Sequence, residues 1–287
     1  MKRDMQITFG GVRGSMPVSD ARYTAFGGAT TCVLVDNGEN GRLLFDAGTG
    51  LRTLQPLLTA ADEQHPVLML FTHYHLDHLM GLPNFAPLYD PAWNILFAAP
   101  PCDGVTAEQA VRRFMAPPFW PAAFRARQRF HTLPAACGDT PFCHGPFDVR
   151  WCAVHHANGC HAYRVDERGS GASLVFATDL EWSSSSGPER DALERLCREP
   201  APVDVLIMEG HHDAKSLAGW GHSTWQEAVQ LARTVAARQL VITHLAPEDD
   251  DSVLAERERR LRELMPAARL GRQGLSIAWN KGDRRPD

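Results

Sequence analysis

The sequence predicts an α/β fold in one domain that spans residues 1–287. Short apolar runs typical of strands alternate with segments that have helical periodicity. A chain of 287 residues, 44% of them hydrophobic, is also long enough to bury a large core. The sequence has no fixed-period repeat, low-complexity tract or convincing linker, which favours a single domain.

The predicted strands are apolar runs rich in β-branched residues, and most of them lead directly into a Gly-rich turn or a polar cluster. Asn37 to Gly41 has the composition of a hairpin turn between two of these strands. Ligands in open α/β sheets bind beyond the strand ends, so we expect the chemistry of this chain there. The strands are expected at 6–9, 30–36, 41–45, 67–71, 147–154, 162–166, 173–177, 203–209, 239–243 and 274–279.

Helices are predicted at four places, and their ends carry recognisable signals. In the third helix, Ser223 and Gln226 have the spacing of a capping box, and the acidic start of the fourth suits the helix dipole. Residues 101–135 combine a helical pattern with prolines and aromatic residues, and we expect them to form a lid-like insertion. The helices are expected at 51–61, at 108–115, from Ser223 onward, and from Asp249 to Leu264.

Charge and apolar content exclude two classes of function. With 29 basic and 34 acidic residues the net charge is −5, so the chain has no general basic field for non-specific nucleic-acid binding. No stretch reaches the ~18 apolar residues of a membrane span, and the start lacks the apolar region of a secretion signal. Seven cysteines, an odd number without a CxxC pair, suit a reducing compartment. We therefore expect a cytoplasmic protein without a membrane partner.

The most informative motif is HYHLDH at residues 73–78, directly after a predicted strand. In an extended loop His73 and His75 project to the same side, while Asp77 and His78 follow on the turn and can aim at a neighbouring point. Imidazole and carboxylate groups are ligands for Zn²⁺, Mn²⁺ and Fe²⁺, and no thiolate lies nearby in the sequence. This spacing predicts a metal site, with zinc as the first candidate.

Further groups of the same kind follow other predicted strands. His155 and His156 follow one strand, Asp179 another and His244 a third. Taken alone, Asp179 suits a helix cap or a turn as well as a ligand, and His244 suits a core histidine. Together with residues 73–78 they supply enough ligands for two divalent metal ions at one edge of a sheet.

The chain resembles the metallo-β-lactamase fold superfamily, and in particular its phosphodiesterase branch, which includes ribonuclease Z. The resemblance covers most of the chain and is carried by GVRGSMP, GGATTC, FDAGTG, THYHLDH, the later His, ATD and the final THLAP. It implies a four-layer αβ/βα sandwich with a binuclear metal site in the shared cleft. Carried over by position, it implies that His73, His75 and His156 hold one metal, that Asp77, His78 and His244 hold the other, and that Asp179 bridges them.

Two residues refine the branch within this superfamily. The segments VLIMEG and GWGHST resemble the phosphodiesterase branch, in which a strand-end Glu and a His form a proton-shuttling pair, here Glu209 and His222. A histidine needs an orienting carboxylate to act as an acid near neutral pH, and Glu209 supplies one. The nearby His211 and His212 are rivals for this role, and we assign them to the rim of the site or to positions that support its ligands.

These assignments predict hydrolysis of a phosphoester bond. Two cations would lower the pKa of a water to give hydroxide at neutral pH and would hold the attacked phosphorus. Asp179, with Asp77 as the other catalytic carboxylate, would orient that hydroxide, and His222 would donate a proton to the leaving oxygen. Arg13 and Ser15 in the Gly-rich loop are candidate contacts for an anionic substrate.

Substrate size separates the remaining possibilities. Proteins of the ribonuclease Z type grip tRNA with a long protruding arm, and this sequence has no comparable insertion. With a net charge of −5 as well, we expect a small phosphodiester such as a cyclic nucleotide, and not a large nucleic acid. One alternative is hydrolysis of a carboxyl ester, lactone or thioester at the same metals, and another is RNA cleavage like that of ribonuclease Z. The aromatic and proline-rich segment MAPPFWPAAF, residues 115–124, suits either a cover over the cleft or a homodimer contact.

Overall fold

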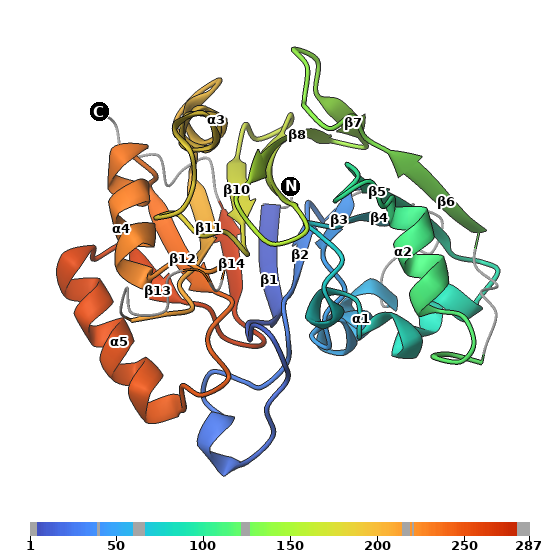
Figure 1. Ribbon diagram of the computed structural model, residues 1–287, viewed down its shortest axis with the longest axis horizontal. Coiled ribbons are helices and arrows are strands. Elements are labelled where there is room, and N and C mark those ends of the chain that lie inside the picture. The colour runs from blue at the N-terminus through green and yellow to red at the C-terminus, as the bar shows by residue number, and fades with distance from the viewer. Residues whose placement is uncertain are drawn as a thin grey trace.

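Two seven-stranded β-sheets form the centre of the protein in a computed structural model that describes residues 5–38, 41–59, 67–121, 127–213, 219 and 221–279 (Figure 1). The first sheet contains β1 (Met5–Gly11), β2 (Cys32–Asp36), β3 (Arg42–Phe45), β4 (Val67–Leu70), β5 (Asn94–Ala99), β6 (Arg127–Thr132) and β14 (Ser276–Trp279). Its strand order is β14-β1-β2-β3-β4-β5-β6. The pairs from β14 to β3 are antiparallel and those from β3 to β6 are parallel, so β3 and β4 end at the same edge.

The second sheet has the order β13-β12-β11-β10-β9-β8-β7. It contains β7 (Phe142–His144), β8 (Phe147–Val154), β9 (Cys160–Glu167), β10 (Ser173–Ala177), β11 (Val205–Glu209), β12 (Gln239–Thr243) and β13 (Ala268–Leu270). The four strands β10 to β13 run parallel, while β7, β8, β9 and β10 pair antiparallel. The carboxyl ends of β10, β11 and β12 therefore share one edge.

The two sheets pack face to face. Phe45 of β3 stacks on Phe176 of β10, with ring centroids 4.5 Å apart and an interplanar angle of 13°. Along β2, Val33 and Val35 belong to the core between the sheets, whereas Leu34 belongs to the core on the other face of the first sheet. Because successive side chains of a strand point to opposite faces, strands that are apolar throughout are buried on both sides.

Helices cover the outer face of each sheet and complete four layers (Figure 1). In the described residues, α1 and α2 pack on the first sheet and α3, α4 and α5 on the second. This arrangement is the αβ/βα sandwich that the resemblance predicts. The helices are α1 (Leu51–Thr59), α2 (Ala107–Phe114), α3 (Gly187–Arg198), α4 (Trp225–Thr234) and α5 (Asp251–Leu264).

Four of these helices were predicted, and their ends differ in detail. The last two residues of the helix expected at 51–61 lie outside the described part of the chain. The expected capping box of α4 is wrong: Thr224 is the N-cap and pairs with Glu227. Ser223 does not cap, because its hydroxyl donates to the Leu180 carbonyl at 2.5 Å. The helix α3 was not predicted.

Residues 101–135 were expected to form a lid-like insertion, and their described part contributes α2 and β6 to the first sheet and its outer layer. Helix α2 packs on β5 and β6, and β6 pairs with β5 as a parallel strand of the first sheet. Thr106 and Gln109 form the capping box of α2, which explains why this segment has a helical pattern. The described part of this segment thus belongs to the first sheet and the helices that cover it. No helix among the described residues is long and apolar enough to cross a membrane.

Candidate metal centre

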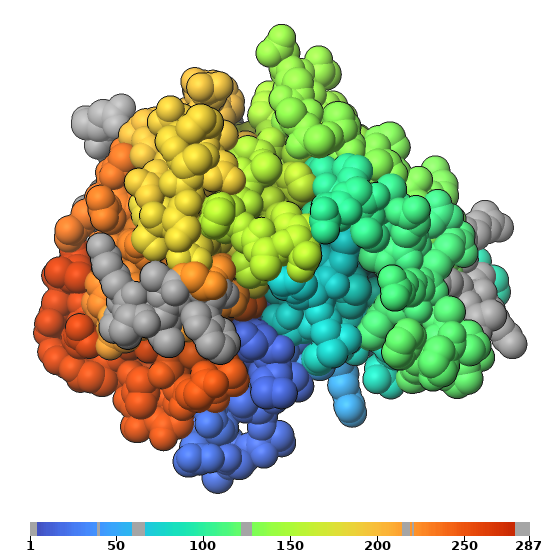
Figure 2. Space-filling view, in the orientation of Figure 1, coloured from blue at the N-terminus to red at the C-terminus, as the bar shows by residue number. Residues whose placement is uncertain are grey.

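The predicted site residues lie at strand ends or in the loops that follow them. The HYHLDH segment, residues 73–78, follows β4, and His156 follows β8. Asp179 lies just beyond β10, Glu209 ends β11 and His244 follows β12. Since β10, β11 and β12 are parallel neighbours, the last three side chains meet at one edge of the second sheet. Figure 2 shows the yellow-green segment around 155–160 against the cyan segment around 70–80 on one face of the molecule.

The backbone turns sharply where three of these strands end. Asp46, Asp179 and His244 follow β3, β10 and β12 with φ angles of 57°, 55° and 54°. This left-handed conformation is uncommon outside glycine, and Asp, Asn and His adopt it most readily. The turns bring these side chains together with their neighbours: Asp179 Oδ1 lies 3.1 Å from His244 Nε2.

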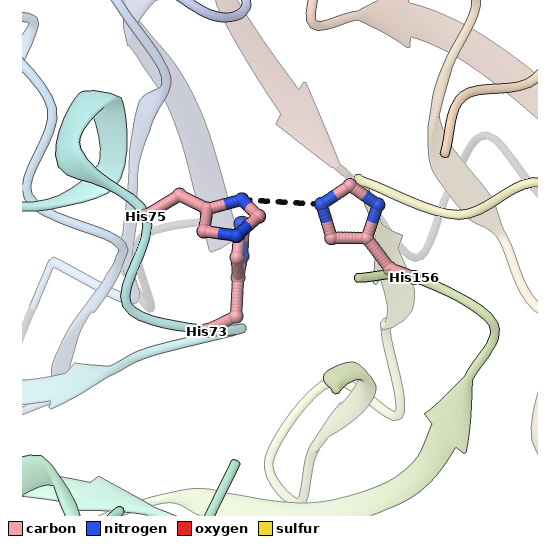
Figure 3. Close-up of side chains that lie close together, drawn as sticks. All are labelled: His73, His75 and His156. Atoms are coloured by element: carbon pink, nitrogen blue, oxygen red, sulfur yellow. Dashed lines mark hydrogen bonds between the residues drawn. The ribbon is translucent and has the colours of Figure 1, made fainter. Parts of the chain in front are cut away.

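One group of ligand atoms comes from both halves of the fold (Figure 3). His73, His75 and His156 direct ring nitrogens to one point, with His75 Nδ1 3.2 Å from His156 Nε2. Asp179 Oδ1 lies 3.9 Å from His73 Nε2 and 3.8 Å from His156 Nε2. The structure therefore brings together the four residues predicted for the first metal.

A second group lies on the other side of Asp179. Asp77 Oδ2 is 3.2 Å from His78 Nε2 and 3.3 Å from His244 Nε2. Asp179 Oδ2 lies 3.2 Å from His78 Nε2, while its Oδ1 faces His244. Asp179 is thus placed between the two groups, where the prediction has it bridging two metals.

The donor atoms of both groups fit divalent cations. His73 Nε2, His78 Nε2 and Asp179 Oδ2 are buried and have no hydrogen-bond partner within the described part of the chain. A buried polar atom without a partner is costly, and two bound cations would satisfy all three. The Cys160 thiol lies 3.8 Å from His73 Nδ1, but burial raises its pKa well above the usual range, so it stays protonated. The ligand set is nitrogen and oxygen, as zinc, manganese and iron accept.

Asp46 supports ligands of both groups, a role that sequence analysis missed. Its Oδ2 accepts a hydrogen bond from His78 Nδ1 at 2.9 Å and one from the Thr72 hydroxyl at 3.0 Å. The same hydroxyl is 3.0 Å from His73 Nδ1, which can donate to it. Hydrogen bonds of this kind fix which ring nitrogen carries the proton and leave Nε2 for the metal. The only sequence signal was the position of Asp46 in FDAGTG at the end of a strand.

Glu209 and His222 form the predicted pair beside Asp179. His222 Nδ1 donates to Glu209 Oε2 at 3.0 Å and lies 4.0 Å from Asp179 Oδ1. Glu209 is fully buried, and its other oxygen accepts from the backbone N–H of Leu180. Burial opposes a charge on His222, but the Glu209 carboxylate raises the pKa of His222 to about 9. The pair can therefore hold a proton at neutral pH.

Of the other histidines near the site, His211 and His212 lie beside His222, whereas His155 faces away from the predicted ligands. The His211 ring stacks on His222 at 4.4 Å, and its Nδ1 donates to the His244 carbonyl at 3.0 Å. Burial lowers the pKa of His211 to about 2, so this ring is neutral. His212 contacts the His211 ring at 4.7 Å. The His155 side chain is 46% exposed and faces Glu189 at 3.8 Å, so His156 is the member of that pair directed at the site.

The two predicted substrate contacts have different surroundings. Ser15 is exposed, and its backbone N–H donates to Asp77 Oδ2 at 2.9 Å, so it lies beside the metal-binding residues. Arg13 is fully buried, and its guanidinium donates to the carbonyls of Gly27, Ala246 and Asp249. The structure contradicts the expected anion contact of Arg13, because a substrate cannot reach it. Arg13 instead ties the Gly-rich loop to the segment after β12.

A four-layer sandwich with histidines and aspartates gathered at its strand ends defines a protein of the metallo-β-lactamase fold. The sequence matches the family model of the β-lactamase superfamily domain over residues 41–245, and the chain belongs to this family. It is thus a hydrolase of the metallo-β-lactamase superfamily, whose fold implies divalent metal ions, typically zinc. The His and Asp groups described above fit such ions.

Curated relatives of the chain include ribonucleases. The chain is 23% identical to ribonuclease BN of Cronobacter sakazakii, in an alignment that covers 95% of this chain and 99% of that protein. A shorter match to ribonuclease Z of Brevibacillus brevis is 28% identical over 130 residues. That match covers 42% of this chain and spans only 38% of that protein's length. These similarities support the predicted ribonuclease Z-like branch of the superfamily.

Solved structures confirm the predicted fold. The metallo-β-lactamase fold protein YhfI from Bacillus subtilis superposes with a TM-score of 0.69 at 20% identity, covering 95% of this chain and 99% of that chain. A diphosphatase from the PhnP family also has a TM-score of 0.69, at 18% identity, covering 97% of this chain and 98% of that chain.

Proposed function

We propose that this hydrolase cleaves a small phosphodiester, such as a cyclic nucleotide, with two divalent metal ions. The observation that supports this reaction best is the His222–Glu209 pair, bonded at 3.0 Å and located 4.0 Å from Asp179. Cleavage of a phosphodiester leaves a negative charge on the departing oxygen, and a positioned acid can neutralise it. A proton donor beside the metal-binding residues is suited to that need.

The residues that would hold the metals are those of the two groups. His73, His75 and His156 would bind one ion, Asp77, His78 and His244 the other, and Asp179 both. When bound, two such ions activate a water at neutral pH and stabilise charge on the attacked phosphoryl group. Asp77 and Asp179 would orient the attacking water through their carboxylate oxygens.

The proton would travel through His222. Since Nδ1 is bonded to Glu209, Nε2 is the ring nitrogen that can donate to the leaving oxygen. Glu209 keeps the ring oriented and stabilises its charged form. The neutral His211 ring stacked on His222 limits the rotation of the donor. Ser15, exposed beside Asp77, is proposed to contact the substrate anion.

Two further functions of the same site compete with this proposal. The ribonuclease BN relative matches the chain over nearly its whole length, which favours an RNA-processing endonuclease as the second candidate. The net charge of −5 and the buried position of Arg13 favour a small substrate over a large RNA. Hydrolysis of a carboxyl ester, lactone or thioester would use the same metals but would have little need of the His222–Glu209 pair.

The test begins with metal analysis of the purified protein and continues with turnover of bis(4-nitrophenyl) phosphate, cyclic nucleotides, a lactone panel and precursor tRNA. We expect about two divalent ions per chain and turnover of the phosphodiesters. His222→Ala should lower that turnover by about 10²-fold or more, since general acids contribute roughly this much. His155→Ala, an exposed neighbour of the site, is the control and should retain activity. Lactone hydrolysis without phosphodiester hydrolysis would overturn the proposal, and cleavage of precursor tRNA alone would favour the endonuclease.

A further inference from the structure

We propose that Glu181 is a positioning residue. It holds the backbone at Gly221, which contacts His156 and directly precedes His222. Glu181 lies two residues beyond Asp179, is only 2% exposed and contacts none of the predicted ligands in the described structure. Sequence analysis gave it no role. Two of its three described partners are backbone N–H groups, those of Gly219 and Gly221, and Gly221 contacts His156 and directly precedes His222.

The Glu181 carboxylate is held by three described hydrogen bonds. It accepts from the backbone N–H of Gly219 at 2.7 Å and of Gly221 at 3.0 Å. The Ser184 hydroxyl donates to it at 2.5 Å. Hydrogen bonds to a buried carboxylate are stronger than those between neutral groups. Both oxygens are engaged, one by Gly219 and Ser184 and the other by Gly221.

Gly221 passes this restraint to His156. Its carbonyl accepts a hydrogen bond from His156 Nδ1 at 2.8 Å, which directs Nε2 of that ring towards His75 and Asp179. Gly221 has a φ of 84°, and a Cβ on it would lie 2.8 Å from His156 Nδ1. Only glycine allows this approach without strain. Glu181 thus holds the N–H of Gly221, and the carbonyl of Gly221 determines which nitrogen of the His156 ring carries the proton.

The residues on each side of this contact are also joined. His222, directly after Gly221, forms the pair with Glu209. Ser223 donates to the Leu180 carbonyl at 2.5 Å, and its hydroxyl accepts from Trp182 N–H at 3.1 Å. Hydrogen bonds therefore join residues 180–182 to residues 221–223 on both sides of Glu181. Glu181 therefore orients both His156, a predicted metal ligand, and His222, the proposed proton donor, through the short stretch of backbone at 221–223.

Two substitutions separate this role from simple stabilisation. In Glu181→Gln the side chain keeps its size, but an NH₂ group replaces one acceptor oxygen and faces an N–H donor, so one contact is lost. Glu181→Ala removes all of them. Glu189→Gln is the matched control, since Glu189 is a nearby carboxylate that caps α3 at Ser186 and does not contact Gly219 or Gly221.

The first readout needs neither metal nor substrate. In the metal-free protein, amide exchange at whichever of Gly219 and Gly221 faces the new NH₂ group should become at least about tenfold faster in Glu181→Gln, because a hydrogen bond to a charged group is lost. In Glu181→Ala, exchange at both glycines should become faster. The second readout is zinc affinity by competition with a chelator. One of two zinc equivalents should bind about 10- to 100-fold more weakly, the usual effect of removing a partner that orients a ligand. Glu189→Gln should match the unmodified protein in both.

The assignment of His222 as proton donor rests on the proposed function, whereas the His156 part does not. Exchange rates and zinc affinities of a folded Glu181→Gln variant equal to those of the unmodified protein would overturn the role of Glu181, even if phosphodiesters are cleaved. Absence of phosphodiester turnover in the unmodified protein would overturn the proposed function while leaving both readouts able to support Glu181. If Glu181→Ala does not fold, Glu181→Gln alone decides. A kcat loss in Glu181→Gln with KM unchanged would further support positioning of His222.

Discussion

Replacing Asp46 by Asn should weaken both metal sites while leaving the fold intact. Asp46 Oδ2 accepts from His78 Nδ1 and from the Thr72 hydroxyl, and that hydroxyl contacts His73 Nδ1. Asparagine has the same shape, but an NH₂ group would face the His78 ring. The ring proton would then move to Nε2, the atom directed at Asp179, where it opposes a cation.

The size of the effect follows from these contacts. Loss of a partner that orients a metal ligand lowers affinity by about 10- to 100-fold, or about 1.4 to 2.8 kcal/mol. His78 belongs to one group and His73 to the other, so both zinc equivalents should be affected. The direct contact to His78 should produce the larger change, because His73 is reached only through Thr72.

Competition titration with a zinc chelator measures the affinity of each of the two zinc equivalents. Urea unfolding measures the stability of the metal-free protein. Asp204→Asn is the matched control, since Asp204 is also buried and accepts from the backbone and hydroxyl of Ser173 but contacts no predicted ligand. Both variants should lose some stability, and only Asp46→Asn should lose zinc affinity. Equal zinc affinities in the two folded variants would refute the orienting role of Asp46.

Three further outcomes test other parts of the structure. Tyr163→Phe removes a buried hydroxyl that donates to the Phe71 carbonyl at 2.6 Å and should lower the free energy of unfolding by about 1 kcal/mol in urea titrations; an unchanged midpoint would contradict this. His156→Ala should reduce zinc affinity about tenfold or more while His155→Ala does not, and equal losses in chelator competition would show that the wrong histidine has been assigned. Burial opposes ionisation of Glu258, but Arg272 at 2.6 Å lowers its pKa below the usual 4.5, so its contribution to stability is present above pH 4.5 and is lost as pH falls through the lower folded value. The stability difference between the protein and Glu258→Gln should therefore shrink on acidification, and a difference that grows below pH 4.5 would refute this sign.

The sequence predicted the parts of the site that depend on local pattern. HYHLDH is contiguous, so its ligands could be found from spacing alone. Asp179 and His244 could be paired with it because parallel strands end at a common edge. Asp46 was missed as a partner of His78 because their contact depends on β3 pairing with β4, which no local pattern shows. Glu181 and Gly221 are 40 residues apart, and their hydrogen bond exists only in the folded chain.

The errors have similar physical causes. Arg13 sits in a Gly-rich loop that resembles an anion-binding turn, yet its guanidinium is used by backbone carbonyls of distant segments. Residues 101–135 have the prolines and aromatics expected of a lid, but their described part contains α2, which packs on β5 and β6, and the edge strand β6 of the first sheet. Ser223 and Thr224 both have a Glu or Gln three residues later, so the sequence alone did not decide between them.

The left-handed backbone at Asp46, Asp179 and His244 has a consequence for how the protein acquires metal. Such conformations cost about 1–3 kcal/mol each and persist only where the surrounding packing imposes them. We therefore expect the packing of the two sheets, and not a bound ion, to impose these turns. In contrast to small zinc modules that unfold without their ion, this hydrolase should keep its architecture after treatment with a chelator and recover its ions without refolding.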